Sequence, residues 1–311
     1  TVYLNGHYLG SNVSGYSEFV LDISDYINFG KKNVLVVRVD ASQFEGWFYE
    51  GAGIYRHVWL EKYNPVHIAE YGTFVSSTVK NNIATVAVET KVANNGFNRA
   101  ATSLVYYIYD KNGNKVTGTL VEGVSVVNGD TKKIQYQFKI TDPKLWNLDD
   151  PYLYKLTTLL KQNDKVIDST NTTFGIRTIV MDAAKGLSLN GKPIKIYGVC
   201  CHQDHAGVGS AVPDALQYYR IKLLKEMGVN AYRTSHNPPT PELLQACDEL
   251  GMLVLDENRL LNSSAENMSQ FERMILRDRN HASVFMWSIG NEIPEIVDTL
   301  GYETSKRLAD F

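Results

Sequence analysis

The stretch Asp278-Arg-Asn-His-Ala-Ser-Val-Phe-Met-Trp-Ser-Ile-Gly-Asn-Glu292 decides the fold of the last third of the chain. Its apolar run Val284–Trp287 predicts a buried strand, because both faces of such a run must be covered. The strand is predicted to end at Ser288-Ile289-Gly290, and Asn291 and Glu292 follow directly. A carboxylate just past the carboxyl end of a parallel strand occupies the position where (β/α) barrels keep their catalytic groups. A lone glutamate at a strand end is commonly only a solvated loop residue, but the fifteen-residue pattern around Glu292 favours the catalytic interpretation.

Three further steps of strand and helix precede this stretch. The predicted strands are Ile194–Val199, Val229–Arg233 and Met252–Asp256. The predicted helices begin at Asp214, as a cap paired with Gln217, at Thr240-Pro241, and at Ser269, as a cap paired with Glu272. Four such steps joined by short loops predict the first half of a (β/α)8 TIM barrel over residues 178–311.

Antiparallel β-structure is predicted before the barrel. The alternating runs Val2–Leu4, Phe19–Leu21 and Asn33–Val39, with turn residues such as Asn5-Gly6 between them, indicate half of a β-sandwich in residues 1–64. Further runs follow Asn64-Pro65 at a spacing typical of a sandwich, namely Val86–Val92, Ser103–Tyr109, Lys133–Ile140 and Tyr154–Leu160. We therefore expect a second all-β unit in residues 65–177.

The composition excludes several classes of protein. The chain has 311 residues, of which 44% are hydrophobic and 21% charged, as in globular proteins with more than one domain. A net charge of −3 gives no electrostatic basis for binding nucleic acid. No apolar run has the length of a membrane span. We expect neither nucleic acid nor a membrane as a partner, and the cellular compartment stays open.

Two stretches resemble signatures of glycoside hydrolase family 2, whose members are β-galactosidases, β-glucuronidases and β-mannosidases. Asp278–Glu292 is similar to the second signature, and Asn230–Pro238, continuing to Asp248 and Gly251, is similar to the first. Upstream, Trp47–Val58 resembles the end of the family's jelly-roll sugar-binding domain, and Phe174–Arg177 resembles the exit of its immunoglobulin-like domain into the barrel. The resemblance implies three parts: the C-terminal part of a jelly roll (1–64), an immunoglobulin-like β-sandwich (65–177) and half of the catalytic barrel (178–311).

The resemblance also implies roles for residues at the strand ends. Glu292 would be the general acid/base, and Asn291 would hydrogen-bond the sugar 2-hydroxyl, a contact that strengthens in the transition state. Arg233 would orient carboxylates at the floor of the site, while His202 and His236 would contact substrate hydroxyls. We interpret Glu257, at the end of the neighbouring strand, as a supporting hydrogen-bond partner within the substrate-binding group.

No metal or other cofactor is expected. Cys200, Cys201 and Cys247 are an odd number without CxxC spacing, and no second Cys/His pair follows at zinc spacing. Metal-dependent β-galactosidases of the family carry a Glu-X-His magnesium site shortly after the Asp-Glu of the third strand. The corresponding stretch here is Leu260-Leu261-Asn262-Ser263, so an active-site magnesium is not expected.

The expected function is that of a retaining exo-β-glycosidase, most similar to a β-galactosidase, acting on an oligosaccharide or glycoside. The family's nucleophile lies on the seventh barrel strand, beyond the end of this chain, so we expect an inactive fragment. β-Glucuronidase is the alternative within the family. The alternative from another class is a non-catalytic carbohydrate-binding β-sandwich protein, and assembly into a homo-oligomer stays open.

Overall fold

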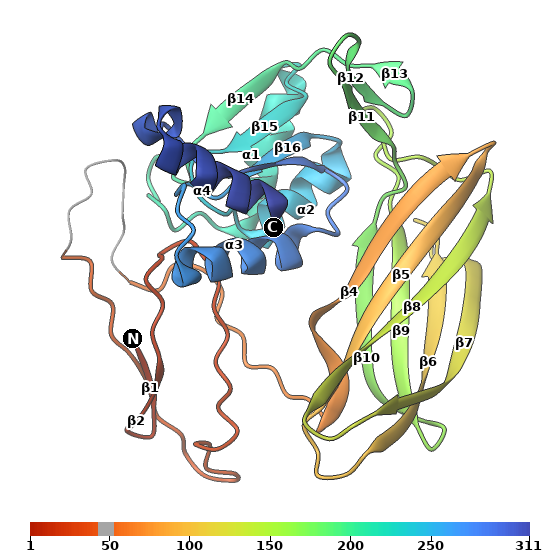
Figure 1. Cartoon of the computed structure of the whole chain (residues 1–311), viewed down its shortest axis with the longest axis vertical. Helices are drawn as coiled ribbons and strands as arrows, with labels where there is room; N and C mark the ends of the chain where they lie inside the picture. The colour runs from red at the N-terminus through yellow and green to blue at the C-terminus, as the bar shows by residue number, and fades with distance from the viewer. Residues whose placement is uncertain (43–52) are drawn as a thin grey trace.

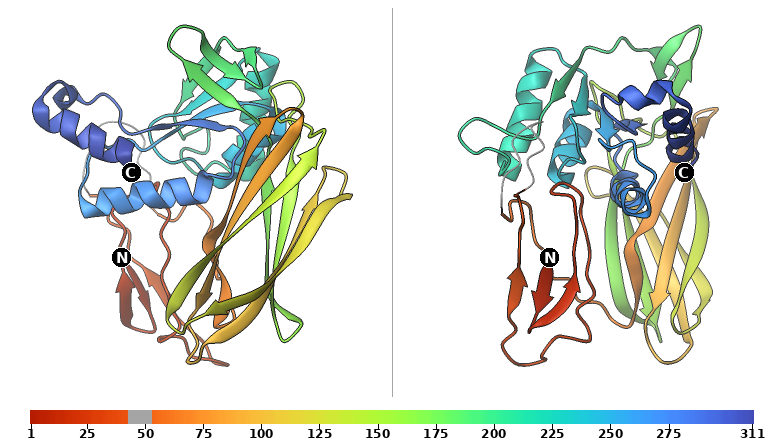
Figure 2. Two further views of the ribbon diagram at one scale, coloured as in Figure 1. Left: turned by 45° about the vertical axis from the view of Figure 1, so that its right-hand side comes forward. Right: turned by 60° about the vertical axis from the view of Figure 1, so that its left-hand side comes forward.

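The computed structural model describes residues 1–42 and 53–311 (Figure 1). The beginning of the segment Trp47–Val58, up to Ala52, lies outside the described residues. The N-terminal sheet and a larger sandwich lie side by side beneath a layer of parallel strands and helices, as the two views of Figure 2 also show. None of the described helices is long and apolar enough to cross a membrane.

The N-terminal region contains a three-stranded antiparallel sheet in the order β2-β1-β3, formed by β1 (Val2–Leu4), β2 (His7–Gly10) and β3 (Leu35–Val37). The predicted turn joins β1 to β2, with Asn5 and Gly6 both at positive φ (53° and 87°), as a two-residue hairpin turn requires. The strand predicted at Phe19–Leu21 is wrong, because this run is irregular and exposes Phe19 and Val20 instead of pairing. The described residues show one sheet here, and the jelly roll stays a prediction.

The second β-unit is a sandwich of two antiparallel sheets, ordered β4-β5-β8 and β10-β9-β6-β7. All four predicted strands are present, and three more accompany them. The bounds are β4 Val66–Lys80, β5 Ile83–Asn94, β6 Ala100–Tyr109, β7 Lys115–Val126, β8 Asp130–Thr141, β9 Tyr154–Gln162 and β10 Lys165–Phe174. Alternate residues of both sheets form one core, in which Val86, Leu104, Ile108, Leu156 and Leu160 are fully buried or nearly so.

A bulge interrupts strand β4 between Ile68 and Thr73. Tyr71 there has a positive φ of 46°, and a Cβ on Gly72 would lie 2.5 Å from the Ala69 carbonyl oxygen, so only glycine fits. The bulge leaves residues 69–72 without partners in the ladder with β5. The Tyr71 carbonyl in the bulge accepts from Arg279 Nη2 (2.9 Å) in the loop after helix α3. β4 is also the edge strand of its sheet, and its outward backbone groups bind the next residue of that loop: Asn280 Nδ2 donates to the Thr73 carbonyl (2.8 Å), and Val75 N donates to Asn280 Oδ1 (2.9 Å).

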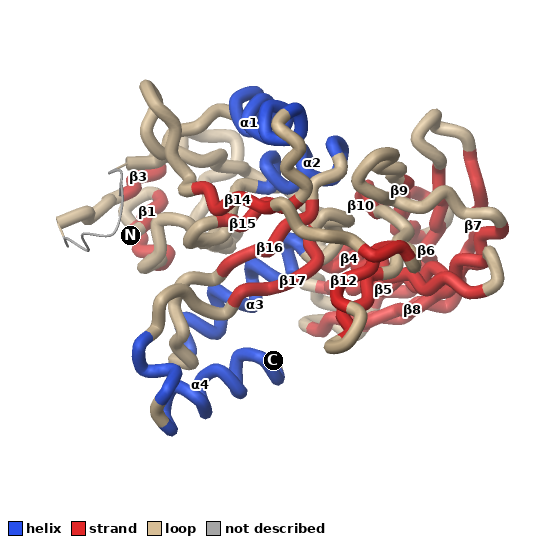
Figure 3. Tube along the Cα trace, turned by 90° about the horizontal axis from the view of Figure 1, so that it is seen from above, coloured by secondary structure: helices blue, strands red, loops and turns tan. Residues whose placement is uncertain are grey.

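The predicted half barrel is confirmed as a four-stranded parallel sheet in the order β14-β15-β16-β17 (Figure 3). Strands and helices alternate along the chain: β14 Gly198–Cys201, α1 Asp214–Glu226, β15 Ala231–Thr234, α2 Pro241–Leu250, β16 Leu253–Glu257, α3 Ala265–Asp278 and β17 Val284–Ser288. The 3-10 turn η1 (Pro294–Val297) and helix α4 (Thr299–Asp310) follow. Tyr232 and Val254 pack against Leu243, Leu244 and Cys247 of α2, so this face of the sheet carries the helices.

A small antiparallel meander that the sequence did not predict precedes the half barrel. It consists of β11 (Ile179–Asp182), β12 (Gly186–Leu189) and β13 (Lys192–Pro193). Leu189 packs with Ala231 and Leu253 from the first residues of β15 and β16, and with Trp146 of the sandwich. The meander therefore closes the amino-terminal end of the barrel strands, opposite the end that carries the polar residues.

Two of the predicted helix caps are wrong. Helix α1 is capped by Pro213, and Asp214 is its first residue, with a carboxylate that pairs with His57 instead of the helix backbone. Helix α3 begins at Ala265, where Ser264 caps it by accepting a hydrogen bond from Asn267 N, so Ser269 lies inside the helix. Helix α2 begins at Pro241 as predicted.

Candidate active site

Polar side chains gather at the carboxyl ends of β15, β16 and β17. Side chains alternate along each strand: Ala231 and Leu253 face the inner side of the sheet, while Tyr232 and Val254 face the helices. Arg233 and Glu257 continue the inner face, and Ser288 pairs with Glu257 in the register of β16 and β17. The strand ends therefore bring residues from three separate parts of the sequence onto one inner rim.

Glu257 is the centre of this group. Its side chain is fully buried, and it accepts hydrogen bonds from Arg233 Nε (2.6 Å), Ser288 Oγ (2.9 Å) and, in the tautomer with a proton on Nδ1, His236 (2.7 Å). Its backbone N donates to Thr234 Oγ1 (2.9 Å). A buried carboxylate requires such partners, because leaving it unpaired costs several kcal/mol. These contacts fix its position.

Arg233 links Glu257 to the residue that precedes Glu292. Its Nη2 donates to Asn291 Oδ1 (2.8 Å), while its Nε binds Glu257. Partial burial lowers the pKa of Arg233, but the hydrogen bond and charge of Glu257 outweigh it and the pKa is raised overall. The planar guanidinium therefore fixes the position of Asn291 Oδ1 relative to the Glu257 carboxylate.

Two histidines lie beside this group. The rings of His202 and His236 pack edge to face with their centroids 5.1 Å apart, and His236 is also bound to Glu257. His202 follows β14 and His236 follows β15. The structure thus places His202, Arg233, His236, Glu257 and Asn291 in one continuous set of contacts.

Glu292 is exposed, as is His202. It directly follows Asn291, whose backbone N donates to the Arg259 carbonyl (3.0 Å), and its own φ is +49°. A left-handed conformation is uncommon for glutamate and costs about 1–3 kcal/mol, and such positions cluster at functional sites. Glu292 is thus exposed to solvent and directly follows Asn291, which Arg233 holds.

Asp256 and Asp278 form a buried acidic pair behind the rim. Burial, followed by the charge of Asp278, raises the pKa of Asp256 well above the usual range of a carboxyl group. Asp278 itself binds Arg277 at 2.6 Å. Asp256 lies 3.4 Å from Thr234 Oγ1, the hydroxyl that accepts from Glu257 N. The pair supports the strand end from the helix side.

Two contacts of the rim were missed in the sequence. Ser288 looked only like the end of a strand, although its hydroxyl binds Glu257. Arg56 and Gln203 bind one another across 147 residues. No local motif could have paired Arg56 with Gln203. The only signal in the sequence was the turn Gly53-Ile54-Tyr55-Arg56 before the second β-unit.

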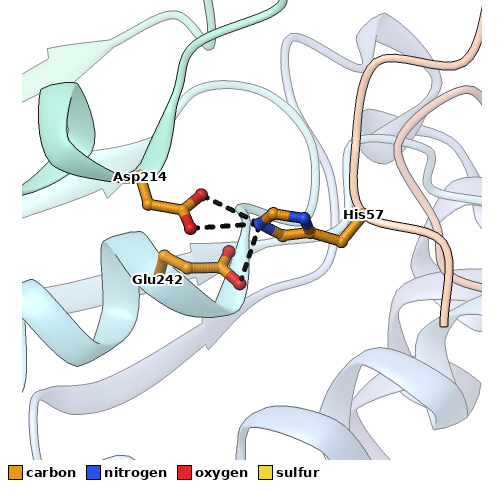
Figure 4. A group of neighbouring side chains, drawn as sticks. All are labelled: His57, Asp214 and Glu242. Atoms are coloured by element: carbon orange, nitrogen blue, oxygen red, sulfur yellow. Dashed lines mark hydrogen bonds and ion pairs between the residues drawn. The ribbon is translucent and has the colours of Figure 1, made fainter.

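One group of described residues has the composition of a metal site: His57, Asp214 and Glu242 (Figure 4). His57 Nε2 lies 3.0 Å from Asp214 Oδ1 and 3.8 Å from Glu242 Oε1, and all three side chains are at least a quarter exposed. An exposed ion pair accounts for this geometry. At the rim, Leu260–Ser263 after β16 contains only apolar, amide and hydroxyl side chains, so it offers a magnesium ion no carboxylate or imidazole. The three cysteines are free thiols.

Comparison with known proteins assigns two parts of the chain. The family model "Glycosyl hydrolases family 2, TIM barrel domain" matches residues 180–308, and the model "Glycosyl hydrolases family 2" matches residues 66–177. β-Galactosidase BoGH2A of Bacteroides ovatus is 38% identical over the whole chain, and a putative β-glucuronidase of Formosa agariphila is 34% identical over 94% of it. The crystal structure of a glycosyl hydrolase family 2 member from Bacteroides cellulosilyticus superposes with a TM-score of 0.94 at 38% identity, over 99% of this chain and 43% of that one.

The chain is shorter than these relatives. It spans 38% of the B. ovatus β-galactosidase and 28% of the F. agariphila protein.

Proposed function

Since this chain belongs to glycosyl hydrolase family 2, we propose that it is part of a retaining exo-β-glycosidase that hydrolyses terminal β-linked sugars. Glu292 is the general acid/base in this proposal. The observation that carries it is the set of contacts around Glu257, which fixes Arg233, His236 and Asn291, the residue directly before the exposed Glu292. A non-catalytic carbohydrate-binding protein would not require this arrangement at the barrel strand ends.

Asn291 is suited to bind the sugar 2-hydroxyl. Its Oδ1 accepts from Arg233, so its Nδ2 is the donor that it directs to a ligand. An imidazole whose Nδ1 donates to Glu257 carries its acceptor on Nε2, and His236 is oriented in this way toward a sugar hydroxyl. His202 is proposed to bind a second hydroxyl from the neighbouring strand end.

The second carboxylate of the double-displacement mechanism is proposed to come from outside these 311 residues. In a retaining enzyme the nucleophilic carboxyl group lies about 5–5.5 Å from the acid/base carboxyl group, so that it can reach the anomeric carbon. Glu257 does not suit this role, because its side chain is fully buried and bound by three other side chains. It acts instead on the substrate-binding residues through Arg233 and His236. In this proposal the 311-residue chain alone has no hydrolase activity, and no metal or cofactor takes part.

We propose β-galactoside as the substrate, with β-glucuronide as the alternative. The B. ovatus relative, aligned over the whole chain, is named a β-galactosidase, whereas the F. agariphila relative is named a putative β-glucuronidase. Hydrolysis of a panel of nitrophenyl glycosides by the whole protein distinguishes the two. Residues 1–64 are proposed to be the C-terminal part of a jelly-roll sugar-binding domain, 65–177 an immunoglobulin-like domain, and 178–311 the first half of the catalytic barrel.

The test of the mechanism is Glu292→Gln in the whole protein, with Glu303→Gln as control, an exposed glutamate of helix α4. General-acid assistance contributes roughly 10²–10⁴-fold and matters most for strongly basic leaving groups. The Glu292 variant should lose most of its activity on alkyl glycosides but far less on dinitrophenyl glycosides, and azide should partly restore turnover by capturing the glycosyl-enzyme. Equal loss on both substrates without azide rescue would exclude Glu292 as the acid/base.

A further inference from the structure

The loops that carry His202 and His236 begin where the strand ladder ends. The last pair in the register of β14 and β15 is Cys201 with Thr234. His202 therefore lies one residue, and His236 two residues, beyond the last ladder pair. Backbone pairing between these strands does not fix either histidine, so their separation must be set by other contacts.

Arg56, from the segment that follows the N-terminal sheet, provides such contacts to both loops. Its Nη2 donates to the Pro238 carbonyl (3.0 Å) and to Gln203 Oε1. Gln203 Nε2 in turn donates to the Asn237 carbonyl. Gln203 is the neighbour of His202, and Asn237 is the neighbour of His236. One guanidinium and one amide thus close a ring of hydrogen bonds around the two loops.

Arg56 is itself fixed from the N-terminal side. Its Nη1 donates to the Tyr16 carbonyl (2.6 Å), and its guanidinium carbon lies 5.5 Å from the ring centroids of both Tyr16 and Tyr55. The Tyr55 hydroxyl donates to the Gly15 carbonyl (2.6 Å). Burial lowers the pKa of Arg56, yet an arginine stays charged under all physiological conditions. The Arg56 side chain thus connects the segment Gly15–Tyr16 to the loops that carry His202 and His236.

We propose that Arg56 is a positioning residue for glycoside hydrolysis, which fixes the spacing of His202 and His236 by clamping their loops to the N-terminal domain. This inference rests on the proposed function. A substrate-binding group displaced by about 1 Å can reduce the rate about 100-fold. The N-terminal domain, on this view, contributes to the site without contacting the sugar.

The test compares Arg56→Ala and Arg56→Lys with His57→Ala in the whole protein. His57 is the matched control, because it belongs to the same segment but makes an exposed ion pair. We expect Arg56→Ala to lower kcat/KM roughly 100-fold, with Arg56→Lys intermediate because an ammonium cannot bind three acceptors in a plane. His57→Ala should stay within about twofold of the parent, the effect of losing an exposed pair. If Arg56→Ala does not fold, Arg56→Lys carries the same comparison.

A double-mutant cycle distinguishes positioning from a general loss of stability. In a His202→Ala background, Arg56→Ala should cost much less than in the parent, because part of what it positions is already absent. Additive losses would overturn the proposal.

Hydrogen exchange separates this inference from the proposed function. Amides in the segments 202–209 and 235–240 should exchange faster in Arg56→Ala but not in His57→Ala. Faster exchange in a protein that hydrolyses no glycoside would reject the proposed function and keep the clamp. Unchanged exchange in both segments would reject the clamp whatever the activity.

Discussion

Replacing Arg233 with methionine should destabilise the barrel part of the chain strongly, because it removes the cationic partner of a buried carboxylate. Methionine has a similar length and retains the apolar contacts of the arginine stem, so the change isolates the charge and the hydrogen bonds. Glu257 would keep His236 and Ser288 as donors, and Asn291 would lose the group that orients its amide.

The size of the effect follows from the burial of the two partners. Glu257 is 0% exposed and the Arg233 side chain 31%. Removing one member of a fully buried pair costs roughly 3–5 kcal/mol, and the partial exposure of Arg233 places the expected loss near the lower end, at about 3 kcal/mol. The neutral double variant Arg233→Met with Glu257→Gln should recover part of this loss and give a coupling energy of about 2 kcal/mol.

Urea unfolding of the 311-residue chain, followed by tryptophan fluorescence, measures these free energies. Trp287 packs against the helix face of the sheet and reports on the barrel part. Arg38→Met is the control, since Arg38 pairs with Asp40 at 72% and 58% exposure and its loss should leave the free energy of unfolding nearly unchanged. If Arg233→Met behaves like Arg38→Met, or the coupling energy is below about 0.5 kcal/mol, the pair does not stabilise the rim.

Three further outcomes are expected. Asn280→Ala should lower the free energy of unfolding by about 1–3 kcal/mol in urea titrations, because the backbone groups of Thr73 and Val75 lose their partner; an effect within error would refute the role of this contact. Burial lowers the pKa of His281, but Asp248 outweighs it and the pKa is raised above 6.5. The stabilisation by this pair should therefore be complete below pH 6.5 and disappear as the pH rises through the pKa of the folded protein, a dependence that His281→Gln should lack in urea midpoints from pH 6 to 9. EDTA should leave the activity of the whole protein nearly intact, and a large loss that magnesium reverses would contradict our interpretation of Leu260–Ser263.

The sequence predicts the half barrel well because its signal is local. Apolar runs of strand length alternate with amphipathic helices, so β15, β16 and β17 are placed within two residues of their observed bounds. The first strand is placed four residues too early. Ile194 belongs to the preceding meander, where its backbone N binds the Leu187 carbonyl, and an apolar run does not reveal which sheet it joins.

Long-range partners explain the other errors. The cap predicted at Asp214 fails because His57 takes its carboxylate. Ser264 and Ser269 both precede helix-forming residues, and local motifs could not choose between them. At the rim, the sequence identifies the polar residues because each one lies at or just after the end of a predicted strand. It does not show that Glu257 is the buried centre, since this depends on Arg233, His236 and Ser288 converging from other elements.

The bulge in β4 limits how freely the parts of this protein can be exchanged. Arg279 binds the carbonyl of Tyr71, which lies in the bulge, and the amide of Asn280 binds Thr73 and Val75 on the outer edge of β4 just beyond it. Asn280 stands four residues before β17, whose end leads to Asn291 and Glu292. A foreign sandwich without this bulge would not present the Tyr71 carbonyl to Arg279. A chimera that replaces the sandwich would therefore have to transplant the bulge along with the loop that binds it.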